Sequence, residues 1–581
     1  MSVSPSAWDH EVDVLVAGSG AAGMGAAIAA HVAGRRVLLI EKTDRIGGST
    51  AVSGGAVWAP LNAQAAAVGH PDSAERVRAY MRAVVGDAAP PEMQQAFLDA
   101  CPAMVDFFQA HSALRLVARS YSPDYYPDRD GAALGGRSLD PAAFDGRLLG
   151  PRFRELRDPL PEFMVLGGMM VNMTDVRHLL AVTKSFAAWR EGMKLVLRYA
   201  ADRLRGYPRG TRLLLGNALA AALFKTVLDR GIDYWLRSPL QRLLLEGGRV
   251  VGAEVVRDGR MLRVHARGGV IVATGGFPWG EDLRAELYPQ PTGPWSMSPS
   301  DNRGEGIALA RGAGAVLGSG HQSPAFWAPV SLRRRADGSV QRYPHLVWDR
   351  AKPGLMAVNG AGQRFVNEST SYHEFVLAMY RSHRQVPTFP AYLVCDHDFI
   401  ERWGLGLALP GGRPRDHLLR DGYLFKAATL PALAVQLGIP GDALAASAAR
   451  FDGFAAKGVD EDFGKGSTAY NRYLGDADHQ PNPCLGPLRR APFYAVKVYA
   501  GDIGTAAGIR CNARAQALDA QGRAIEGLYV AGNDMHSVMG GEYPAPGITL
   551  GPALTFGWIA GTQAAAAAAA PDVPAPPRLA A

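Results

Sequence analysis

The sequence VDVLVAGSGAAG (residues 12–23) decides the fold that we expect for this chain. Its apolar start is too short for a helix and lacks regular polar alternation, so it suits a strand buried on both faces of a parallel sheet. Gly18, Gly20 and Gly23 follow as G-x-G-x-x-G, which permits a tight turn and lets the backbone approach a pyrophosphate. The small residues 21–32 predict a helix whose first amides would hold the phosphates.

A second apolar run, residues 36–40, ends in Glu41, where a carboxylate can accept both hydroxyls of an adenosine ribose. A glycine-rich turn of purely structural origin is the alternative. The strand before, the helix after and the acidic residue together favour a dinucleotide. The residues expected to bind it here are Gly18, Ser19, Gly20, Ala21, Ala22, Gly23, Glu41 and Lys42.

The loop that follows is dense in glycines and hydroxyls: residues 42–58 read KTDRIGGSTAVSGGAVW. Such a loop supplies amides and hydroxyls to a second section of the same ligand. Because nicotinamide enzymes need no such loop, it favours FAD over NAD. The expected donors are Gly47, Gly48, Ser49, Thr50, Ser53, Gly54 and Gly55.

Composition excludes some partners. The chain is 48% apolar and 20% charged, which is ordinary for a globular protein, and its net charge of +7 comes from scattered basic residues apart from residues 333–335. The sequence has no basic stripe interleaved with aromatic residues, so nucleic acid is not a favoured partner. Residues 1–10 do not read as a signal peptide, so we expect a cytoplasmic protein.

Cysteine spacing bears on the electron acceptor. Cys101, Cys395, Cys484 and Cys511 lie far apart and form no C-x-x-C pair or iron-sulfur spacing. We therefore expect an external electron acceptor, such as a quinone, and no metal site.

The longest apolar stretches are residues 213–227 and 554–570. Both are short or rich in alanine and glycine for a span of about 20 apolar residues, so both are predicted to be buried helices. For the first stretch the alternative is a peripheral membrane contact that admits an apolar substrate. Residues 151–207 carry no pattern of recognisable chemistry.

Later segments return to the same ligand. Residues 269–277 repeat a short buried run opening into glycines and bring Ala273 and Gly275 to the cofactor. Residues 525–534 do the same with Gly532 and Asn533, and a rigid loop then feeds a helix near Leu550 whose first amides should face the flavin. The tail after Pro571 is predicted to be disordered.

These patterns predict an α/β protein with a discontinuous, Rossmann-like FAD-binding domain. Residues 331–502 are richer in aromatics, proline and charge, which indicates an inserted α+β domain that caps the flavin and binds substrate. The expected division is residues 1–330 and 503–581 for the FAD-binding domain and 331–502 for the capping domain.

The loop SYSPDYYPD (residues 120–128) is stiffened by two prolines and carries three tyrosines. Tyrosine is often a half-buried core residue with a satisfied hydroxyl, so simple packing remains an open alternative for this loop.

The glycine-rich loop after Glu41 resembles that of the flavoproteins related to fumarate reductase and succinate dehydrogenase. Family members with covalent flavin carry a histidine there, whereas Ser49 and Thr50 occupy the region here. The resemblance therefore implies non-covalent FAD.

The sequence YPAPG (residues 543–547) resembles the loop of the 3-ketosteroid Δ1-dehydrogenases, as do residues 124–126 and 364–372. The family's usual loop is Tyr-Pro-Gly-Pro-Gly, from which Ala545 departs. The resemblance implies a steroid ketone substrate whose 3-keto oxygen is held by the Tyr543 hydroxyl and the Gly547 amide. It also implies that Tyr372 removes a proton from C2 with support from Tyr125, while hydride passes from C1 to flavin N5.

There are three alternatives to that activity. Fumarate reduction needs arginine and histidine for two carboxylates, and Glu542-Tyr543-Pro replaces the expected His-x-x-Arg loop. A Δ4-(5α)-dehydrogenase would act one bond away on the same substrates, and the sequence separates it only through the Tyr543 loop and the Tyr125 motif. A flavin carrier without its own substrate is disfavoured by the organised donors of the capping domain.

Overall fold

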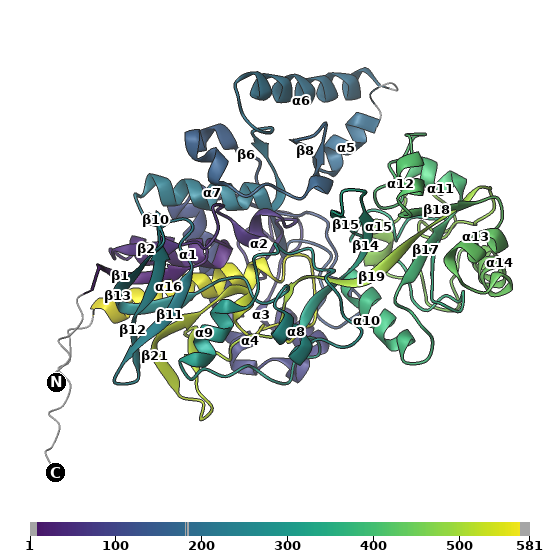
Figure 1. Ribbon diagram of the computed structural model, residues 1–581. Coiled ribbons are helices and arrows are strands. Elements are labelled where there is room, and N and C mark those ends of the chain that lie inside the picture. Colours follow the sequence, from purple (N-terminus) through teal and green to yellow (C-terminus); the bar gives the residue numbers. More distant parts are fainter. Residues whose placement is uncertain (1–7, 181, 183–184, 570–581) are drawn as a thin grey trace, which may run out of the picture.

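The computed structural model describes residues 8–180, 182 and 185–569, so the tail beyond Pro571 and residues 1–7 lie outside the described part. Figure 1 shows two sheets side by side in the body, with one helical unit above them. The first sheet holds the predicted dinucleotide-binding segments, and the second belongs to the capping segment.

The first sheet grows from β1 (His10–Ala17), which lies between β2 (Val37–Ile40) and β13 (Arg260–Val272) and is parallel to both. Val14, Leu15 and Val16 are fully buried, as expected for a strand covered on both faces. β10 (Asp233–Trp235) adds in parallel beside β2, and β21 (Ala524–Val530) adds in parallel beside β13. Strands from both ends of the chain thus share one sheet.

An antiparallel extension continues this sheet. β11 (Leu240–Glu246) pairs with β12 (Arg249–Arg257), which pairs with β13, and β20 (Gln516–Leu518) pairs with β21.

Two helices, α1 (Ala21–Val32) and α16 (Leu550–Ala569), pack directly against each other. A Cβ at Gly561 would lie 2.2 Å from the carbonyl oxygen of Ala26, so the contact is backbone to backbone and requires glycine. The first and second parts of this domain are therefore tightly joined.

The helix α7 (Leu215–Asp229) is buried along most of its length. This confirms the buried helix predicted for residues 213–227. The alternative that this stretch touches a membrane is wrong, because Leu219, Leu223 and Phe224 are all fully covered by protein.

The second sheet is antiparallel and has the order β15-β14-β19-β17-β16, with β18 paired to β19. Its strands are β14 (Ala325–Arg334), β15 (Val340–Pro344), β16 (Leu355–Val358), β17 (Ala391–Cys395), β18 (Leu424–Ala427) and β19 (Phe493–Thr505). The boundaries expected at 330/331 and 502/503 both fall inside strands of this sheet, β14 and β19.

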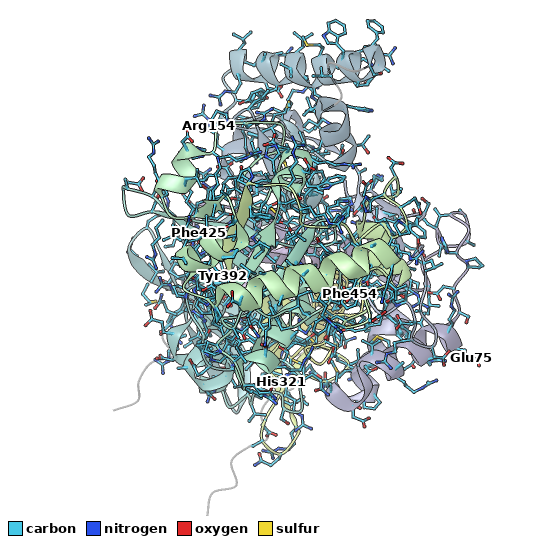
Figure 2. All side chains as sticks on the ribbon, turned by 90° about the vertical axis from the view of Figure 1, so that its right-hand side faces the viewer. Glu75, Arg154, His321, Tyr392, Phe425 and Phe454 are labelled. Atoms are coloured by element: carbon cyan, nitrogen blue, oxygen red, sulfur yellow. The ribbon has the colours of Figure 1, made fainter. Side chains whose placement is uncertain are left out.

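Helices cover both faces of this second sheet. On one face, α13 (Leu430–Leu437) and α14 (Gly441–Lys457) enclose a small separate core that includes Tyr392 and Phe454 (Figure 2). On the other, α10 (Tyr372–His383) packs on β14. Its N-terminus is capped by Ser371, whose hydroxyl accepts the Glu374 N–H at 3.1 Å.

The remaining elements connect these layers. Short strands are β3 (Val57–Trp58), β4 (Leu116–Ala118), β5 (Ser138–Pro141), β6 (Phe144–Asp145), β7 (Met164–Val165), β8 (Met169–Met170) and β9 (Arg212–Leu213). Helices are α2 (Gly48–Ala51), α3 (Ala74–Val84), α4 (Pro91–His111), α5 (Met173–Leu180), α6 (Phe186–Leu204), α8 (Glu281–Leu287), α9 (Glu305–Gly312), α11 (His397–Arg402), α12 (Asp416–Arg420) and α15 (Ala469–Leu474).

The segment that carried no sequence interpretation forms its own projection. α5 and α6 stand above the body of the molecule, and α6 lies at the outer edge in both views (Figures 1 and 2). No helix among the described residues combines the length and the apolar character needed to cross a bilayer.

Candidate active site

Three predicted tyrosines meet where the two sheets adjoin. The Tyr125 hydroxyl donates a hydrogen bond to the Tyr372 hydroxyl at 3.0 Å. The Tyr543 ring stacks on Tyr125 at 5.5 Å between centroids and meets the Tyr372 ring edge-on at 5.0 Å. All three side chains are more than nine-tenths buried. Residues from three distant segments thus form one aromatic cluster.

Local structure fixes each of these loops. The Tyr125 N–H donates to the Pro544 carbonyl at 2.8 Å, and the Tyr80 hydroxyl donates to the same carbonyl at 2.7 Å. Beside Tyr125, the buried Asp124 carboxylate accepts the Arg137 guanidinium at 2.8 Å. The aromatic loop and the C-terminal loop are therefore bound to each other as well as to the scaffold.

Gly547 presents an available backbone donor. Its carbonyl accepts the Trp58 N–H at 3.0 Å and the Gly551 N–H at 2.9 Å, whereas its own N–H donates to no backbone acceptor among the described residues. Its φ of +96° is in the left-handed region, which glycine adopts without strain. The predicted pair of Tyr543 hydroxyl and Gly547 amide therefore lies on one stiff turn.

Burial governs the acidity of these phenols. It raises the pKa of both Tyr372 and Tyr125 well above the ordinary value for tyrosine. Tyr543 adds to this effect at both residues, whereas the hydrogen bond to Tyr372 partly offsets it at Tyr125. Burial also raises the pKa of Tyr543, to about 12, while the hydroxyls of Tyr372 and Thr549 partly offset the shift. All three rest as neutral phenols, so Tyr543 can donate a hydrogen bond, and Tyr372 needs a partner to act as a base.

Two neighbours of this cluster were not predicted. The Tyr470 ring, on α15, lies 4.6 Å from the Tyr125 ring. His373 is fully buried 5.9 Å from the Tyr543 ring, with its Nδ1 accepting the Trp327 N–H and its Nε2 unpartnered. In the sequence, only the position of His373 next to Tyr372 could have indicated that it lies near the site. No sequence feature indicated this for Tyr470.

The predicted dinucleotide turn is formed as expected. The Gly18 N–H donates to the Ile40 carbonyl at the end of β2. Gly20 is the N-terminal cap of α1, and Ala21 and Gly23 lie in its first turn. The Ser19 hydroxyl donates to Glu41 Oε2 at 2.6 Å, so the carboxylate lies directly beside the turn. Glu41 is buried at the strand end, where an acidic residue was predicted to meet the ligand.

The glycine-rich loop folds back onto this turn. Thr50 Oγ1 accepts the Ala21 N–H at 2.9 Å, and the Gly47 N–H donates to the Ser19 hydroxyl at 3.1 Å. Gly48 begins α2, and Ser49 Oγ accepts from Asn302, which also donates to the Gly275 carbonyl. These predicted residues therefore come together around one site.

Other predicted residues of this region have additional partners. The Ser53 carbonyl accepts the Gly216 N–H at 3.1 Å, and Gly55 lies against Leu215, so both pack on the start of α7. Gly54 faces open space. Lys42 pairs with Glu305 at 2.6 Å and donates to the Asp301 carbonyl.

The later segments reach the same place. Ala273 follows β13 and donates its N–H to the Ala17 carbonyl, and Gly532 lies against Ala22. Asp534 accepts backbone N–H groups of Gly275 and Gly276 at 3.2 and 2.9 Å, which joins the two loops. A small cavity is lined by Gly532, Asn533, His536, Thr549 and the first turn of α16, which begins at Leu550.

The polar groups around this cavity fit a dinucleotide flavin. Both ring nitrogens of the buried His536 lack hydrogen-bond partners, and the N–H of Leu550, the first residue of α16, has no backbone acceptor among the described residues. Unpaired buried donors of this kind are costly unless a ligand or water pairs them. The glycine turn, the hydroxyl loop and this cavity together match the donor set that FAD requires.

Comparison with known proteins places these features in context. The family described as FAD binding domain matches residues 13–550. A 3-oxosteroid 1-dehydrogenase of Mycolicibacterium smegmatis is 37% identical over 97% of this chain and 98% of its own length. A 4-oxocyclohex-2-ene-1-carboxylate 5-dehydrogenase of Sinomonas cyclohexanicum is 36% identical over 96% of this chain and 94% of its own.

A solved structure is similar over the whole fold. The 3-ketosteroid Δ1-dehydrogenase of Sterolibacterium denitrificans, in complex with 1,4-androstadiene-3,17-dione, is 37% identical and superposes with a TM-score of 0.89. The match covers 96% of this chain and 100% of that protein. The similarity therefore extends over both sheets.

Proposed function

The chain belongs to the FAD binding domain family, and from this premise we propose that it is a 3-ketosteroid Δ1-dehydrogenase, which desaturates the C1–C2 bond of a 3-ketosteroid. The observation that carries the proposal is the meeting of Tyr125, Tyr372 and Tyr543 between the two sheets, with Gly547 on the same loop as Tyr543 and its N–H without a backbone acceptor among the described residues. A flavin carrier without a substrate has no need for this arrangement.

Each residue has a role in the proposed reaction. The Tyr543 hydroxyl and the Gly547 N–H donate to the 3-keto oxygen and stabilise the negative charge that develops there, as an oxyanion hole does. The polarised carbonyl acidifies C2, from which Tyr372 removes a proton. Tyr125 stabilises the phenolate that forms on Tyr372 through the hydroxyl contact between the two residues.

FAD, when bound, supplies the acceptor for the hydride that leaves C1. The residues of the glycine turn, the hydroxyl loop and the α16 N-terminus would hold it. We propose that it is held without a covalent bond, because Ser49 and Thr50 stand in the loop and both hydroxyls already engage neighbouring groups. An external acceptor such as a quinone would reoxidise it, since all four cysteines are buried and offer no relay.

Product analysis tests the proposed regiochemistry. Purified protein is mixed with an artificial electron acceptor and either androst-4-ene-3,17-dione or its 5α-reduced analogue. A Δ1-dehydrogenase converts the first to the 1,4-diene and the second to the 1-ene. Formation of the 4-ene from the second, with no reaction of the first, would assign the chain to the Δ4-(5α) chemistry instead.

The second relative raises another substrate class, because a cyclic 4-oxo carboxylate offers the same carbonyl chemistry. A buried carboxylate needs a free cation. Near Tyr125, the Arg350 guanidinium is fully engaged by backbone carbonyls and Arg119 pairs with Asp140 at 2.7 Å. Neither cation is available, which favours a neutral ketone and also argues against a dicarboxylate such as fumarate.

A substrate comparison follows from this charge argument. We expect kcat/KM for androst-4-ene-3,17-dione to exceed that for 4-oxocyclohexanecarboxylate by at least about 100-fold, because the carboxylate would be buried unpaired. Methyl 4-oxocyclohexanecarboxylate serves as the neutral control of the same size. Equal rates for the acid and the steroid would contradict the proposed substrate class.

We also propose that the protein works in the cytoplasm at a membrane surface, with α6 as the contact. Phe186 and Leu204 at the two ends of α6 are 76% and 89% exposed, and Trp189 and Leu197 between them are also exposed. These positions repeat with the helical period and so share one side of α6, the helix that projects from the body of the molecule (Figure 1). The interleaved Arg190 and Lys194 pair with Glu191 at 3.1 and 3.0 Å, and both side chains are more than half exposed, so they can also reach anionic lipid head groups.

Vesicle sedimentation tests this contact. We expect the protein to sediment with phosphatidylglycerol-containing vesicles, and the triple variant Phe186→Ser, Trp189→Ser, Leu197→Ser to lose at least about 90% of that binding while keeping its turnover of a soluble steroid. Val435→Ser is the control, because Val435 is 81% exposed on α13 of the capping domain. Unchanged binding of the triple variant would exclude α6 as the contact.

A further inference from the structure

Arg350 lies behind the segment that carries Tyr372. Its side chain is only 2% exposed although it bears a full charge. Nη1 donates to the Glu368 and Thr370 carbonyls at 2.8 and 3.1 Å, and the guanidinium stands over the Phe375 ring at 5.1 Å. These contacts lie just before and just after Tyr372 in the chain, so they hold the start of α10 from inside the protein.

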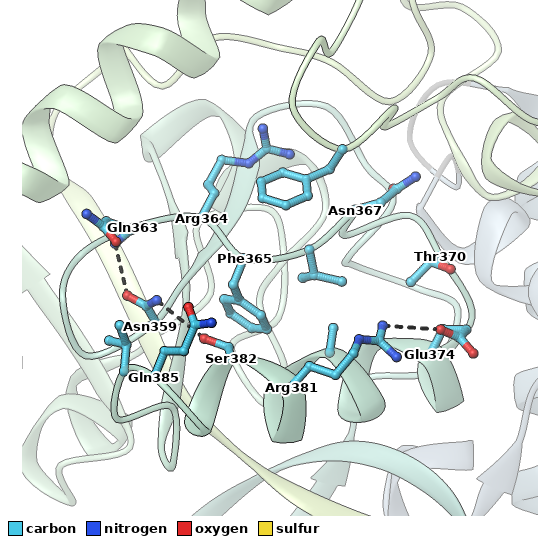
Figure 3. A pocket seen from close by; sticks show the side chains of 14 residues that line it. Asn359, Gln363, Arg364, Phe365, Asn367, Thr370, Glu374, Arg381, Ser382 and Gln385 are labelled. Atoms are coloured by element: carbon cyan, nitrogen blue, oxygen red, sulfur yellow. Dashed lines mark hydrogen bonds and ion pairs between the residues drawn. The ribbon is translucent and has the colours of Figure 1, made fainter. Parts of the chain in front are cut away.

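The outer side of the same segment borders a cavity. Asn367, Thr370 and Glu374 line this cavity of about 430 Å³, which Figure 3 shows beside α10. Arg350 is not among the residues that line it. The place of Tyr372 therefore depends on contacts from the inner side, and those of Arg350 are among them.

The Arg350 charge has no ion-pair partner within the part of the chain that the structure describes. Its other two hydrogen bonds go to the His345 and Leu346 carbonyls at 2.7 and 2.9 Å. Backbone carbonyls are neutral acceptors, so they satisfy the N–H groups of the guanidinium without cancelling its charge. A buried charge of this kind is costly unless an opposite charge lies nearby.

The carboxylates that act on this charge are held elsewhere. They are those of Asp349 and Glu368. Asp349 Oδ2 lies 2.6 Å from His345 Nδ1, and Glu368 pairs with Arg364 at 2.9 Å. Neither carboxylate contacts the Arg350 guanidinium, so its charge is left to act on other neighbours.

Phenols are the remaining groups that face this guanidinium. Burial lowers the pKa of Arg350, and Tyr470 is the largest influence that opposes this shift. Burial raises the pKa of Tyr470, and the Arg350 charge opposes that rise in turn. The Tyr470 ring lies 4.6 Å from the Tyr125 ring of the site. Arg119 also faces Tyr125, but Asp140 pairs with it at 2.7 Å and cancels most of its charge.

We propose that Arg350 is the cation of this site: its guanidinium holds the segment that presents Tyr372 and balances the negative charge that the tyrosine cluster carries when Tyr372 is ionised. It is a positioning residue, because its N–H groups bond backbone carbonyls and not the reacting groups. The inference rests on the proposed function for the role of Tyr372 as a base, whereas the charge balance exists without a substrate.

The balance persists while the proton is transferred. As the C2 proton moves to the ionised Tyr372 oxygen, the electron pair of the C2–H bond spreads onto the 3-keto oxygen. The negative charge thus passes from Tyr372 to the oxygen that Tyr543 holds, and the two rings are 5.0 Å apart. Arg350 gives up no proton, because a guanidinium stays protonated in proteins.

Charge replacement tests this role. Arg350→Gln keeps a hydrogen-bond donor and removes the charge. An opposite charge close to an acid changes its ionisation by about 1 to 3 pH units, so kcat/KM at neutral pH should fall at least about tenfold in this variant. Arg350→Lys restores the charge and should recover at least about threefold of that loss. Arg350→Met is a second uncharged variant and should match the glutamine variant.

A merely structural role predicts a different order. Lysine cannot span the four carbonyls, so the lysine and glutamine variants would then lose activity alike, and that result would overturn the proposal. Arg415→Gln is the matched control. Arg415 also donates to backbone carbonyls of the capping part, those of Ile400 and Leu409, but it pairs with Glu401 at 2.6 Å. This control should keep the wild-type kcat/KM.

Ultraviolet titration of the flavin-loaded enzyme gives a readout without substrate. The phenolate absorption that Tyr372→Phe lacks identifies the ionisation of the cluster. Its midpoint should lie at least about one pH unit higher in Arg350→Gln than in wild type or Arg350→Lys. If no steroid is turned over but this difference appears, the proposed function fails and the charge balance stands. If turnover is normal and the midpoint is unchanged, the role of Arg350 fails and the proposed function stands.

Discussion

Replacing Tyr372 by phenylalanine is expected to reduce kcat by at least about a thousandfold while leaving flavin content unchanged. The proposed base loses its only proton-accepting atom, and general base catalysis contributes about 10² to 10⁴ in rate. The ring itself remains, so its edge-on contact with Tyr543 and the start of α10 should persist. The measurement is steady-state turnover of androst-4-ene-3,17-dione together with the flavin absorption spectrum.

Tyr380→Phe is the control for this prediction. Tyr380 lies on the same helix, and its hydroxyl makes one long hydrogen bond of 3.4 Å to the Pro291 carbonyl. It should keep most of the wild-type rate. Ligand binding, followed by the change in the flavin spectrum, should survive in both variants. A Tyr372→Phe enzyme that turns over near the wild-type rate would remove this residue from the chemistry.

Replacing Tyr543 by phenylalanine is the second large effect that we expect. Loss of one oxyanion donor costs about 3 kcal/mol of transition-state stabilisation, which is about 150-fold in kcat/KM. Packing should be preserved, because the ring contacts with Tyr125 and Phe326 do not involve the hydroxyl. Most of the loss should appear in kcat, since the charge on the oxygen develops only as the reaction proceeds.

The buried Tyr529 on β21 supplies a matched control, Tyr529→Phe, in the same domain. If Tyr543→Phe raised KM alone and left kcat unchanged, the hydroxyl would serve uniform binding and not transition-state stabilisation. A phenylalanine variant with both constants unchanged would leave the Gly547 amide as the carbonyl donor and assign Tyr543 to packing.

Local chemistry explains why the cofactor part could be read from sequence. The glycine turn, the strand before it and Glu41 lie within one short segment of the sequence. Each of these features is needed to bind the same dinucleotide, so they support one another as a prediction. The return of β13 and β21 to the same sheet was predictable because both repeat the pattern of a buried run opening into glycine. Parallel pairing then places their ends together.

Contacts between distant segments could not be derived in the same way. Tyr470 meets Tyr125, and Tyr126 meets Glu374, only because the capping sheet is set at a particular register and angle on the first domain. No periodicity in either segment encodes that arrangement. The resemblance to a known family supplied Tyr125, Tyr372, Tyr543 and Gly547, and the structure brings their side chains and backbone together.

The helix α6 shows a different limit of prediction from sequence. Its apolar residues are spaced as in an ordinary amphipathic helix, and that pattern alone predicts burial against a core. The buried α7 has the stronger apolar run, so the sequence placed the membrane alternative on a helix that the fold covers. Exposure in the folded chain separates the two cases, and sequence composition does not.

The backbone contact between α1 and α16 has a consequence for biogenesis. The segments that complete the first sheet and cover α1 leave the ribosome only after the whole capping segment has been synthesised. Until then the glycine turn of the nascent chain lacks α16 and the loop after β21, which complete the cofactor site. We therefore expect the cofactor site to be complete only after α16 has been synthesised, and nascent chains stalled before α16 should accumulate as colourless, protease-sensitive species.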